Sequence, residues 1–464
     1  MFNIPTQRLA KVTLTESTDS AVTLSVNPIV IAALSFTPRH LVVRVNAKTA
    51  STAGYERDNI QLQFNGDTGS NYNVHYLSGV GSSTGAARIN GAATYLMGQT
   101  AADDANYFAG GECLLPDALS TRSHKSAVSL TGANEDILQT TIGRWANTAA
   151  ITSVTFTSYQ SPNQWLAGST FELCVVDESF NIDQDGDGEQ IKTGDGTFTV
   201  SSISAADGDL VVIGNVRADR NAVGDAVKLN INDDATSGNY VGQVVYGAPG
   251  VGAGATALNV ANITGDTAAS SAFAGMVVQF SNFADGSNDP SYTSLSGYHG
   301  ATDNSGVFFY SARRNNVEAI TKLLFAPETG TNFKTGSMLS TYAVPKNLIT
   351  RTELTGNTYP VTISSIPDTY DHLELSIYAK ASVWSAVNCQ IYFNGETSSD
   401  VANYKRQLFQ GREAAASANT SAGDATHFAV TGTDSSSTAE EFSSVTFTFY
   451  NYKKTDRHKH FMTS

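Results

Sequence analysis

The chain repeats one sequence pattern three times, at an interval as long as a domain. Leu41, Leu210 and Leu373 each begin a short apolar run, and successive runs lie 169 and 163 residues apart. Three tyrosines recur at nearly the same interval: Tyr72, Tyr240 and Tyr404. An interval of about 165 residues is the size of a typical protein domain. Because an internal repeat determines the whole architecture, we expect tandem copies of one domain.

The ends of the first two units agree as well as their beginnings. Ala150–Thr152 matches Ala319–Thr321, and Gly168–Ser169 matches Gly336–Ser337, at offsets of 169 and 168 residues. Two independent anchors therefore support one offset. The predicted domains are residues 1–177, 178–343 and 344–464.

The third unit contains no counterpart of Ala150–Val176. We expect that about 45 residues of the natural chain are absent, or that this copy has a shortened core. A unit without these strands would leave open sheet edges for a partner to cover. Because linkers such as Tyr342–Lys346 are short, the tandem units are expected to form an extended rod.

Within each unit, apolar and polar residues alternate with a period of two. Ile60–Phe64, Val154–Phe156 and Phe171–Val175 all show this pattern. It predicts strands with one buried and one solvent-exposed face, in antiparallel sheets. Clusters of Gly, Ser, Asn, Thr and Ala separate about eight such strands in each unit. The predicted fold class is all-β, with tandem antiparallel β-sandwich domains of jelly-roll type.

One turn recurs at the same place in all three units. Its residues are Asn65 and Gly66, Asn232 and Asp233, and Asn394 and Gly395. A two-residue type I′ hairpin needs positive φ at both central positions, which Asn, Asp and Gly tolerate best. The turn is thus interpreted as structural. The recurrent tyrosines that follow it are interpreted in the same way, as packing residues of a shared fold.

Four segments of the first unit carry a resemblance to a known family: Phe64–Tyr72, Gly143–Trp145, Thr148–Val154 and Ala167–Phe171. Together they resemble a module found in tandem in phage virion proteins, among tail-fibre and capsid-decorating appendages. This resemblance implies a jelly-roll β-sandwich and a structural or adhesive role in a virus particle. It implies no catalytic residues.

The later units depart from this pattern. The second unit has Arg313 in the place of Arg144, but Arg314 in the place of Trp145. The third unit keeps Phe393–Glu396 and lacks the terminal motif. These departures weaken the case for one binding role in all units, although they leave the shared fold intact.

The most metal-like segment places three carboxylates at alternate positions: Asp183, Asp185 and Asp187. Hard cations such as Ca²⁺ bind oxygens in this pattern. However, Gly194 stands at the twelfth position, where a calcium loop has a bidentate Glu. The alternative interpretation is a solvated acidic hinge between the first two units. Apart from possible Ca²⁺, no cofactor is expected.

Two basic segments are candidates for contact with phosphate or an anionic glycan. The residues are Arg122, His124 and Lys125 in the first unit, and Lys453, Lys454 and Arg457 in the third. A metal ion bound by His458 and His460 is not expected, because the neighbouring lysine and arginine side chains would repel it. Both segments are expected to be exposed loops, and the alternative is that they have no binding role.

Charge and composition exclude several classes of partner. The net charge is −15, so nucleic acid and anionic membranes are not expected partners. The longest apolar stretch, Pro28–Leu34, is far shorter than the ~20 residues of a membrane helix. No signal peptide is recognised at the beginning of the sequence. Three scattered cysteines are typical of a protein assembled in a reducing cytoplasm.

No nucleophile motif or phosphate-binding loop is present. Adjacent carboxylates such as Asp103 and Asp104 point to opposite faces of a strand, which disfavours glycoside cleavage. We therefore expect a non-enzymatic virion structural protein, a fibre or surface appendage of the tail, neck or capsid. The expected partners are further copies in a homotrimer and other virion proteins. The alternatives are a receptor-recognition protein that binds host glycans through loops such as Ser78–Gly85 and Ala414–Ala422, and a polysaccharide-degrading tailspike. Trp145, Trp165 and Trp384 would stack on sugars if exposed, but packing in the core is the favoured interpretation for most aromatic residues.

Overall fold

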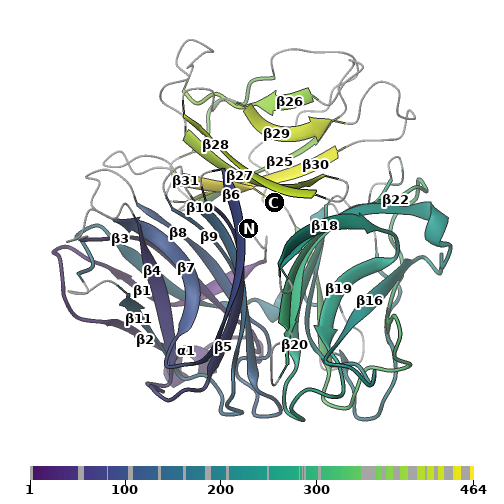
Figure 1. Cartoon of the computed structure of the whole chain (residues 1–464), viewed down its shortest axis with the longest axis horizontal. Coiled ribbons are helices and arrows are strands. Elements are labelled where there is room, and N and C mark those ends of the chain that lie inside the picture. Colours follow the sequence, from purple (N-terminus) through teal and green to yellow (C-terminus); the bar gives the residue numbers. More distant parts are fainter. Residues whose placement is uncertain are drawn as a thin grey trace.

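The computed structural model contains almost only antiparallel β-strands (Figure 1). It confirms the predicted all-β class and the sandwich arrangement of the sheets. The structure describes residues 4–50, 57–80, 82–102, 108–133, 137–159, 164–182, 190–204, 208–247, 250–281, 283–284, 286, 289–300, 305–345, 361–367, 372–379, 387–394, 405–412, 415–422, 427–432, 443–450 and 460–463.

The first unit consists of a large sheet, in the order β1-β12-β3-β8-β9-β10-β5-β6, and a small sheet, in the order β2-β11-β4-β7. A short parallel pairing of β3 with β7 joins the two. The elements are β1 (Thr6–Thr13), β2 (Val22–Ser25), α1 (Pro28–Ala32), β3 (Leu41–Thr49), β4 (Arg57–Phe64), β5 (Tyr72–Val80), β6 (Ser83–Ala92), β7 (Tyr95–Ala102), β8 (Ala109–Leu115), β9 (Lys125–Ala133), β10 (Ile137–Trp145), β11 (Ser153–Ser158) and β12 (Thr170–Val176).

The second unit repeats this topology strand for strand. Its large sheet runs β13-β24-β15-β20-β21-β22-β17-β18, and its small sheet runs β14-β23-β16-β19. The sequence pattern predicted about eight strands per unit, whereas β1–β12 and β13–β24 make twelve in each. The elements are η1 (Glu178–Phe180), β13 (Gln190–Ile191), β14 (Phe198–Val200), β15 (Gly208–Val216), β16 (Gly224–Ile231), η2 (Ser237–Asn239), β17 (Tyr240–Gly247), β18 (Val251–Thr256), β19 (Asn259–Thr264), β20 (Ala274–Ser281), β21 (Ser291–His299), β22 (Ser305–Arg314), β23 (Leu323–Pro327) and β24 (Met338–Pro345).

The described part of the third unit contains three smaller sheets, in the orders β25-β30-β31, β26-β29 and β27-β28. Phe447 and Phe449 of β30 are buried beside Leu373 and Leu375 of β25. The predicted domain limits remain predictions. The elements are β25 (His372–Ala379), β26 (Val387–Gln390), β27 (Lys405–Arg412), β28 (Ala415–Ala422), β29 (His427–Gly432), β30 (Ser443–Tyr450) and β31 (His460–Thr463).

The small sheets have one buried and one solvent-exposed face, as the alternating pattern predicted. Ile60, Leu62 and Phe64 of β4 are buried, while the residues between them are partly exposed. Their side chains pack against the inner face of the large sheet; for example, Phe156 contacts Phe171 with ring centroids 5.0 Å apart. This apolar layer between the two sheets is the core of the unit.

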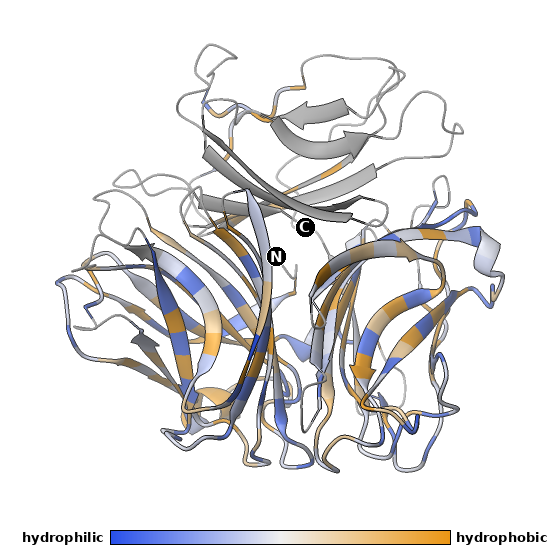
Figure 2. Ribbon diagram, viewed as in Figure 1, coloured by the Kyte–Doolittle hydropathy of each residue, from blue (hydrophilic) through white to orange (hydrophobic). Residues whose placement is uncertain are grey.

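The large sheets do not follow the prediction of one wet face. Every residue of β12 is buried, including Glu172 and Cys174, which the alternation had placed in solvent. Glu172 is neutralised by Lys11 at 2.7 Å. The outer face is buried because a second apolar cluster joins the first unit to the second, with members such as Val42 and Val128 on one side and Val211 and Val277 on the other. Figure 2 shows hydrophobic residues on the strands at this boundary.

Three equivalent hairpins meet where the units come together (Figure 1). These are β5–β6, β17–β18 and β27–β28, one from each unit. Their contacts are cyclic: β6 lies against β17, β18 lies against β27, and β28 lies against β5. β22 lies against β5 in the same way that β10 lies against β27. The units therefore surround a pseudo-threefold axis, and the expectation of an extended rod is wrong.

Candidate functional sites

The recurrent turn has the predicted backbone geometry, but it does not form a hairpin. Asn65 has φ 55° and Gly66 has φ 67°, and the amide of Asp67 donates to the carbonyl of Phe64 at 3.0 Å. Yet β4 pairs with β7 and β11, whereas β5 pairs with β6 and β10. The turn therefore carries the chain from the small sheet to the large one. The prediction of a hairpin is wrong, because the turn type does not by itself decide which strands pair.

The Asn65 side chain fastens this turn to the segment before β11. Its Nδ2 donates to the Ala150 carbonyl at 2.8 Å, and its Oδ1 accepts from the amides of Thr152 and Ser153 at 2.7 and 3.1 Å. In the second unit, Asn232 makes the equivalent bonds at Ala319, Thr321 and Lys322. The agreement of the unit ends in sequence thus has a structural cause, and the interpretation as a structural turn holds for both units.

The recurrent tyrosines close the same turn from inside the sandwich. Tyr72 is buried, its hydroxyl donates to the Asp67 carbonyl at 3.2 Å, and it accepts from the Phe64 amide at 2.9 Å. Tyr240 makes the same pair of bonds to Asp234 and Ile231. Burial raises the pKa of both phenols to about 12. Both tyrosines are packing residues, as predicted.

The replacement of Trp145 by Arg314 is compensated locally. The indole Nε1 of Trp145 donates to the Asp67 carboxylate at 2.6 Å, and this bond lowers the pKa of Asp67. In the second unit, Arg314 donates through Nε to the equivalent Asp234 at 2.9 Å. Both units therefore keep a hydrogen bond to the same aspartate, although the donor is an indole in the first unit and a guanidinium in the second.

Several predicted sites cannot be placed. Asn394 has φ 53°, as expected for the turn, whereas Gly395 lies outside the described residues. Asp183, Asp185, Asp187, Lys453, Lys454, Arg457 and Tyr404 also lie outside them. The part of the chain that the structure describes contains no group of three His, Cys, Asp or Glu side chains able to hold a metal ion. Among the described helices, none is long and apolar enough to cross a membrane.

The basic segment of the first unit is an exposed loop only in part: Arg122 is exposed, whereas Lys125 is buried at the beginning of β9. Lys125 is 1 % exposed, and its ammonium donates to the carbonyls of Ser120, Ser123 and Thr148. Burial lowers its pKa to about 8. The ammonium fastens two chain segments, so the prediction of a free binding cation at this position is wrong. Arg122 forms an ion pair with Asp117 at 2.9 Å.

Polar contacts cross the boundary between the first and second units near this segment. The His124 amide donates to the Ser271 carbonyl at 2.9 Å. Asn215 donates to Ser123 and accepts from Ser126, at 2.9 and 3.0 Å. The segment that was predicted to meet a ligand therefore meets the neighbouring unit.

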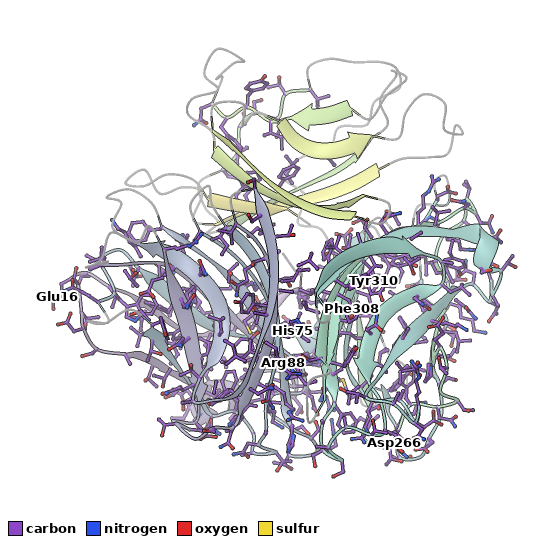
Figure 3. The ribbon with its side chains drawn as sticks, in the orientation of Figure 1. Glu16, His75, Arg88, Asp266, Phe308 and Tyr310 are labelled. Atoms are coloured by element: carbon purple, nitrogen blue, oxygen red, sulfur yellow. The ribbon has the colours of Figure 1, made fainter. Side chains whose placement is uncertain are left out.

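The sequence reasoning missed a group of buried basic side chains at the same boundary. His75, on β5, and Arg144, on β10, come from the first unit, and His299, on β21, comes from the second. Burial and nearby cations lower the pKa of His75 to about 4 and that of His299 to about 3. Figure 3 shows His75 and Arg88 between the two units. The repeat aligned Arg144 with Arg313, but no sequence pattern within one unit shows which residues of the other unit lie opposite Arg144.

A row of aromatic rings crosses the large sheet of the second unit. Tyr246, Phe308 and Tyr298 lie on neighbouring strands, with ring centroids 5.9 Å apart at each step. They alternate along their strands with residues of the boundary cluster, such as Val245 and Val307, so they lie on the opposite face of the sheet. Each of the three rings remains partly exposed. Figure 3 marks Phe308 and its neighbour Tyr310.

Unlike the three rings of this row, the described tryptophans have no exposed ring surface. Trp145 and Trp165 are both buried in the core of the first unit. Trp384 lies outside the described residues. A sugar-stacking role is therefore excluded for Trp145 and Trp165 in this fold.

Comparisons with known proteins give only distant likenesses. No family model and no curated protein matches the chain. A structure of botulinum neurotoxin type C, which depends on two ganglioside molecules to enter cells, has a TM-score of 0.17 and 8% identity, covering 71% of this chain and 94% of that one. The binding domain of botulinum neurotoxin DC, in complex with rat synaptotagmin II, has a TM-score of 0.13 and 10% identity, covering 70% and 93%. Likenesses at these TM-scores carry no argument about this chain.

Proposed function

We propose that the protein is a non-enzymatic structural component of a phage particle, a fibre or surface appendage on the tail, neck or capsid. The observation that carries this proposal is the closed arrangement of three related units around a pseudo-threefold axis, through cyclic contacts of equivalent hairpins. Head-to-tail contacts that close into a ring give a body with a defined end and no tendency to polymerise. Such a body fits coaxially on a threefold-symmetric fibre or vertex.

The resemblance of the first unit to tandem phage virion modules supports the same proposal. Several charged groups of the fold also serve structural roles: Lys125 binds main-chain carbonyls, and Asp67 and Asp234 close turns. A rigid body stabilised in this way suits a particle component that must keep its shape outside the cell.

Immunogold labelling of intact particles tests this proposal. Antibody is raised against the full chain, and particles from a mutant phage that lacks the gene serve as the control. Gold on tail, neck or head of wild-type particles alone supports the proposal and gives the location. Equal labelling of both particle types, or none on either while the antibody detects the protein in infected cells, contradicts it.

A second candidate function, binding of host glycans, is favoured by the aromatic row of Tyr246, Phe308 and Tyr298. Partly exposed aromatic rings in a row offer apolar surface to sugar rings, while the tyrosine hydroxyls offer hydrogen bonds. Glycan-array binding of the full chain tests it. Phe308→Ala is expected to abolish binding, whereas Tyr159→Ala, at an isolated ring 64% exposed, is expected to leave it unchanged. Equal binding by the two variants would contradict the assignment of the row.

A further inference from the structure

Three basic side chains converge at the boundary between the first and second units. Exposed fractions are 3% for His75, 7% for Arg144 and 6% for His299. His75 lies opposite Ile142 in the β5–β10 pairing, two residues from Arg144, and its Nδ1 is 2.8 Å from the Ser305 hydroxyl. Ser305 is in turn the pairing partner of His299. The charges of Arg144 and His75 both act on the pKa of His299, which places the three groups at one location.

These side chains keep polar atoms without a hydrogen-bond partner. Arg144 Nε and Nη1, His75 Nε2 and His299 Nε2 are all buried and unpaired among the described residues. A guanidinium does not lose its proton in a protein. A buried charge without a counter-charge or hydrogen bonds is strongly destabilising. The native protein therefore needs a partner for this group.

No carboxylate supplies that partner within the part of the chain that the structure describes. Burial alone accounts for the lowered pKa of Arg144. The cations that act on the histidines are Arg88 from β6, Arg144 from β10, and Lys125 beside His124. Other buried or partly buried arginines of the same fold have a carboxylate beside them: Arg44 binds Glu112 at 2.9 Å, and Arg217 lies 3.3 Å from Asp266. Arg313, the repeat counterpart of Arg144, lies 3.7 Å from Asp289.

We propose that Arg144, His75 and His299 form a buried site for one small inorganic oxyanion, such as phosphate or sulfate, held between the first and second units. Oxyanion oxygens accept hydrogen bonds from Nε and Nη1 of Arg144. The charge of the anion also favours the imidazolium forms of His75 and His299, whose Nε2 atoms then donate to it. The ligand replaces the missing carboxylate. Because the donors come from both units, the bound anion stabilises the boundary and exchanges only when the boundary opens. This site is independent of where the protein acts and of whether it binds glycans.

The first test measures the anion that the full chain retains and the anion that it takes up. Protein desalted into HEPES is denatured, and the released anions are counted by ion chromatography. The chain is also melted in rising phosphate or sulfate, with chloride at matched ionic strength. We expect either one retained oxyanion per chain, or a rise in Tm of about 1–2 °C for each tenfold increase in phosphate above its Kd. An equal effect of chloride, or neither retention nor a shift, overturns the proposal.

The direction in which one substitution changes Tm gives an independent test. With an anion bound, Arg144→Met abolishes retention and the phosphate-dependent shift and lowers Tm in phosphate. Without an anion, removing an unpaired buried charge raises Tm at every phosphate concentration, and this outcome overturns the site. His299→Gln provides a milder variant with the same expected loss if Arg144→Met does not fold. Arg313→Met, which removes the counterpart that has its own carboxylate, is expected to keep the phosphate dependence.

Discussion

At the scale of single residues, the position with the most specific side-chain requirement is an asparagine at positive φ. Asn65 and Asn232 each combine a left-handed backbone with hydrogen bonds to three main-chain groups about 85–90 residues away. Asn tolerates that backbone better than other side chains do. Only its amide both donates and accepts at this position, so neither Asp nor Gly replaces it fully.

Substitution of Asn65 separates the two contributions. Asn65→Gly keeps the backbone and loses the hydrogen bonds, with an expected loss of about 2 kcal/mol in unfolding free energy. Asn65→Ala also places a Cβ at positive φ, which adds about 1–2 kcal/mol. Denaturant unfolding measures both. Equal losses for the two variants would show that backbone strain does not act at this turn.

His40 makes the contact between the first two units sensitive to acid. Its Nδ1 accepts from the Asp117 amide at 3.0 Å, so the neutral ring donates through Nε2 to Ser340 at 3.3 Å. Burial, followed by the charges of Arg39 and Arg122, lowers the His40 pKa from 6.5 to about 3. Below pH 6.5 the unfolded chain therefore binds a proton that the folded chain does not.

The resulting prediction concerns stability between pH 6.5 and 3. Above pH 6.5, His40 is neutral in both the folded and the unfolded chain and does not change the free energy of unfolding. As the pH falls below 6.5, His40 lowers the free energy of unfolding by up to about 1.4 kcal/mol per pH unit. Urea unfolding across this range measures the slope. His40→Gln, which does not titrate, is expected to make the pH dependence shallower. An unchanged slope in this variant would contradict the assignment.

At the scale of elements, the alternation of apolar and polar residues predicted the buried face correctly in a small sheet but not in a large sheet. Alternation in β4 correctly predicted its buried face, because one face of a small sheet meets solvent. In β12 the same alternation was misleading, because a polar residue in it is buried with its own counter-charge. Local sequence shows which residues share a face, but not what covers that face.

Glycine at position 297 of β21 permits the close approach of the units. A Cβ there would collide with the Gly306 carbonyl oxygen and with the Ile142 side chain of the first unit. Gly297→Ala is expected to reduce stability by about 1–3 kcal/mol through overpacking. Gly254→Ala is the control, because its Cβ would lie 4.0 Å from Val244. Thermal unfolding distinguishes them, and equal Tm values would refute the close approach.

At the scale of the whole molecule, the boundary cluster predicts that the first and second units unfold together. Val128 belongs to that cluster and not to the core within the first unit. Val128→Ala is therefore expected to reduce amide-exchange protection in both β4 and β16, each in a small sheet on the far side of its unit. Gln61→Ala, on the solvent face of β4, serves as the control. Loss of protection in β4 alone would show that the units are independent.

The pseudo-threefold arrangement also bears on the expected homotrimer, which remains a prediction. A threefold object arises either from three chains or from three units within one chain. Light scattering of the full chain after gel filtration separates the two. A trimer mass supports the expected homotrimer. A mass near 49.0 kDa, that of one chain, would contradict it and would show that the threefold arrangement comes from the three units of a single chain.

What the sequence alone determined is local: strands, the recurrent turn, the repeated tyrosines and the existence of related units. These depend on periodicity and on backbone preferences that neighbouring residues carry. Only the tertiary structure decided which faces are buried, that Lys125 is a structural cation, and that Arg144 meets His75 and His299. Burial and charge depend on partners far away along the chain, as His75 and Ser305 show at a separation of 230 residues. A repeat pattern predicts copies of a unit, but the contacts between copies are encoded only by surfaces that meet after folding.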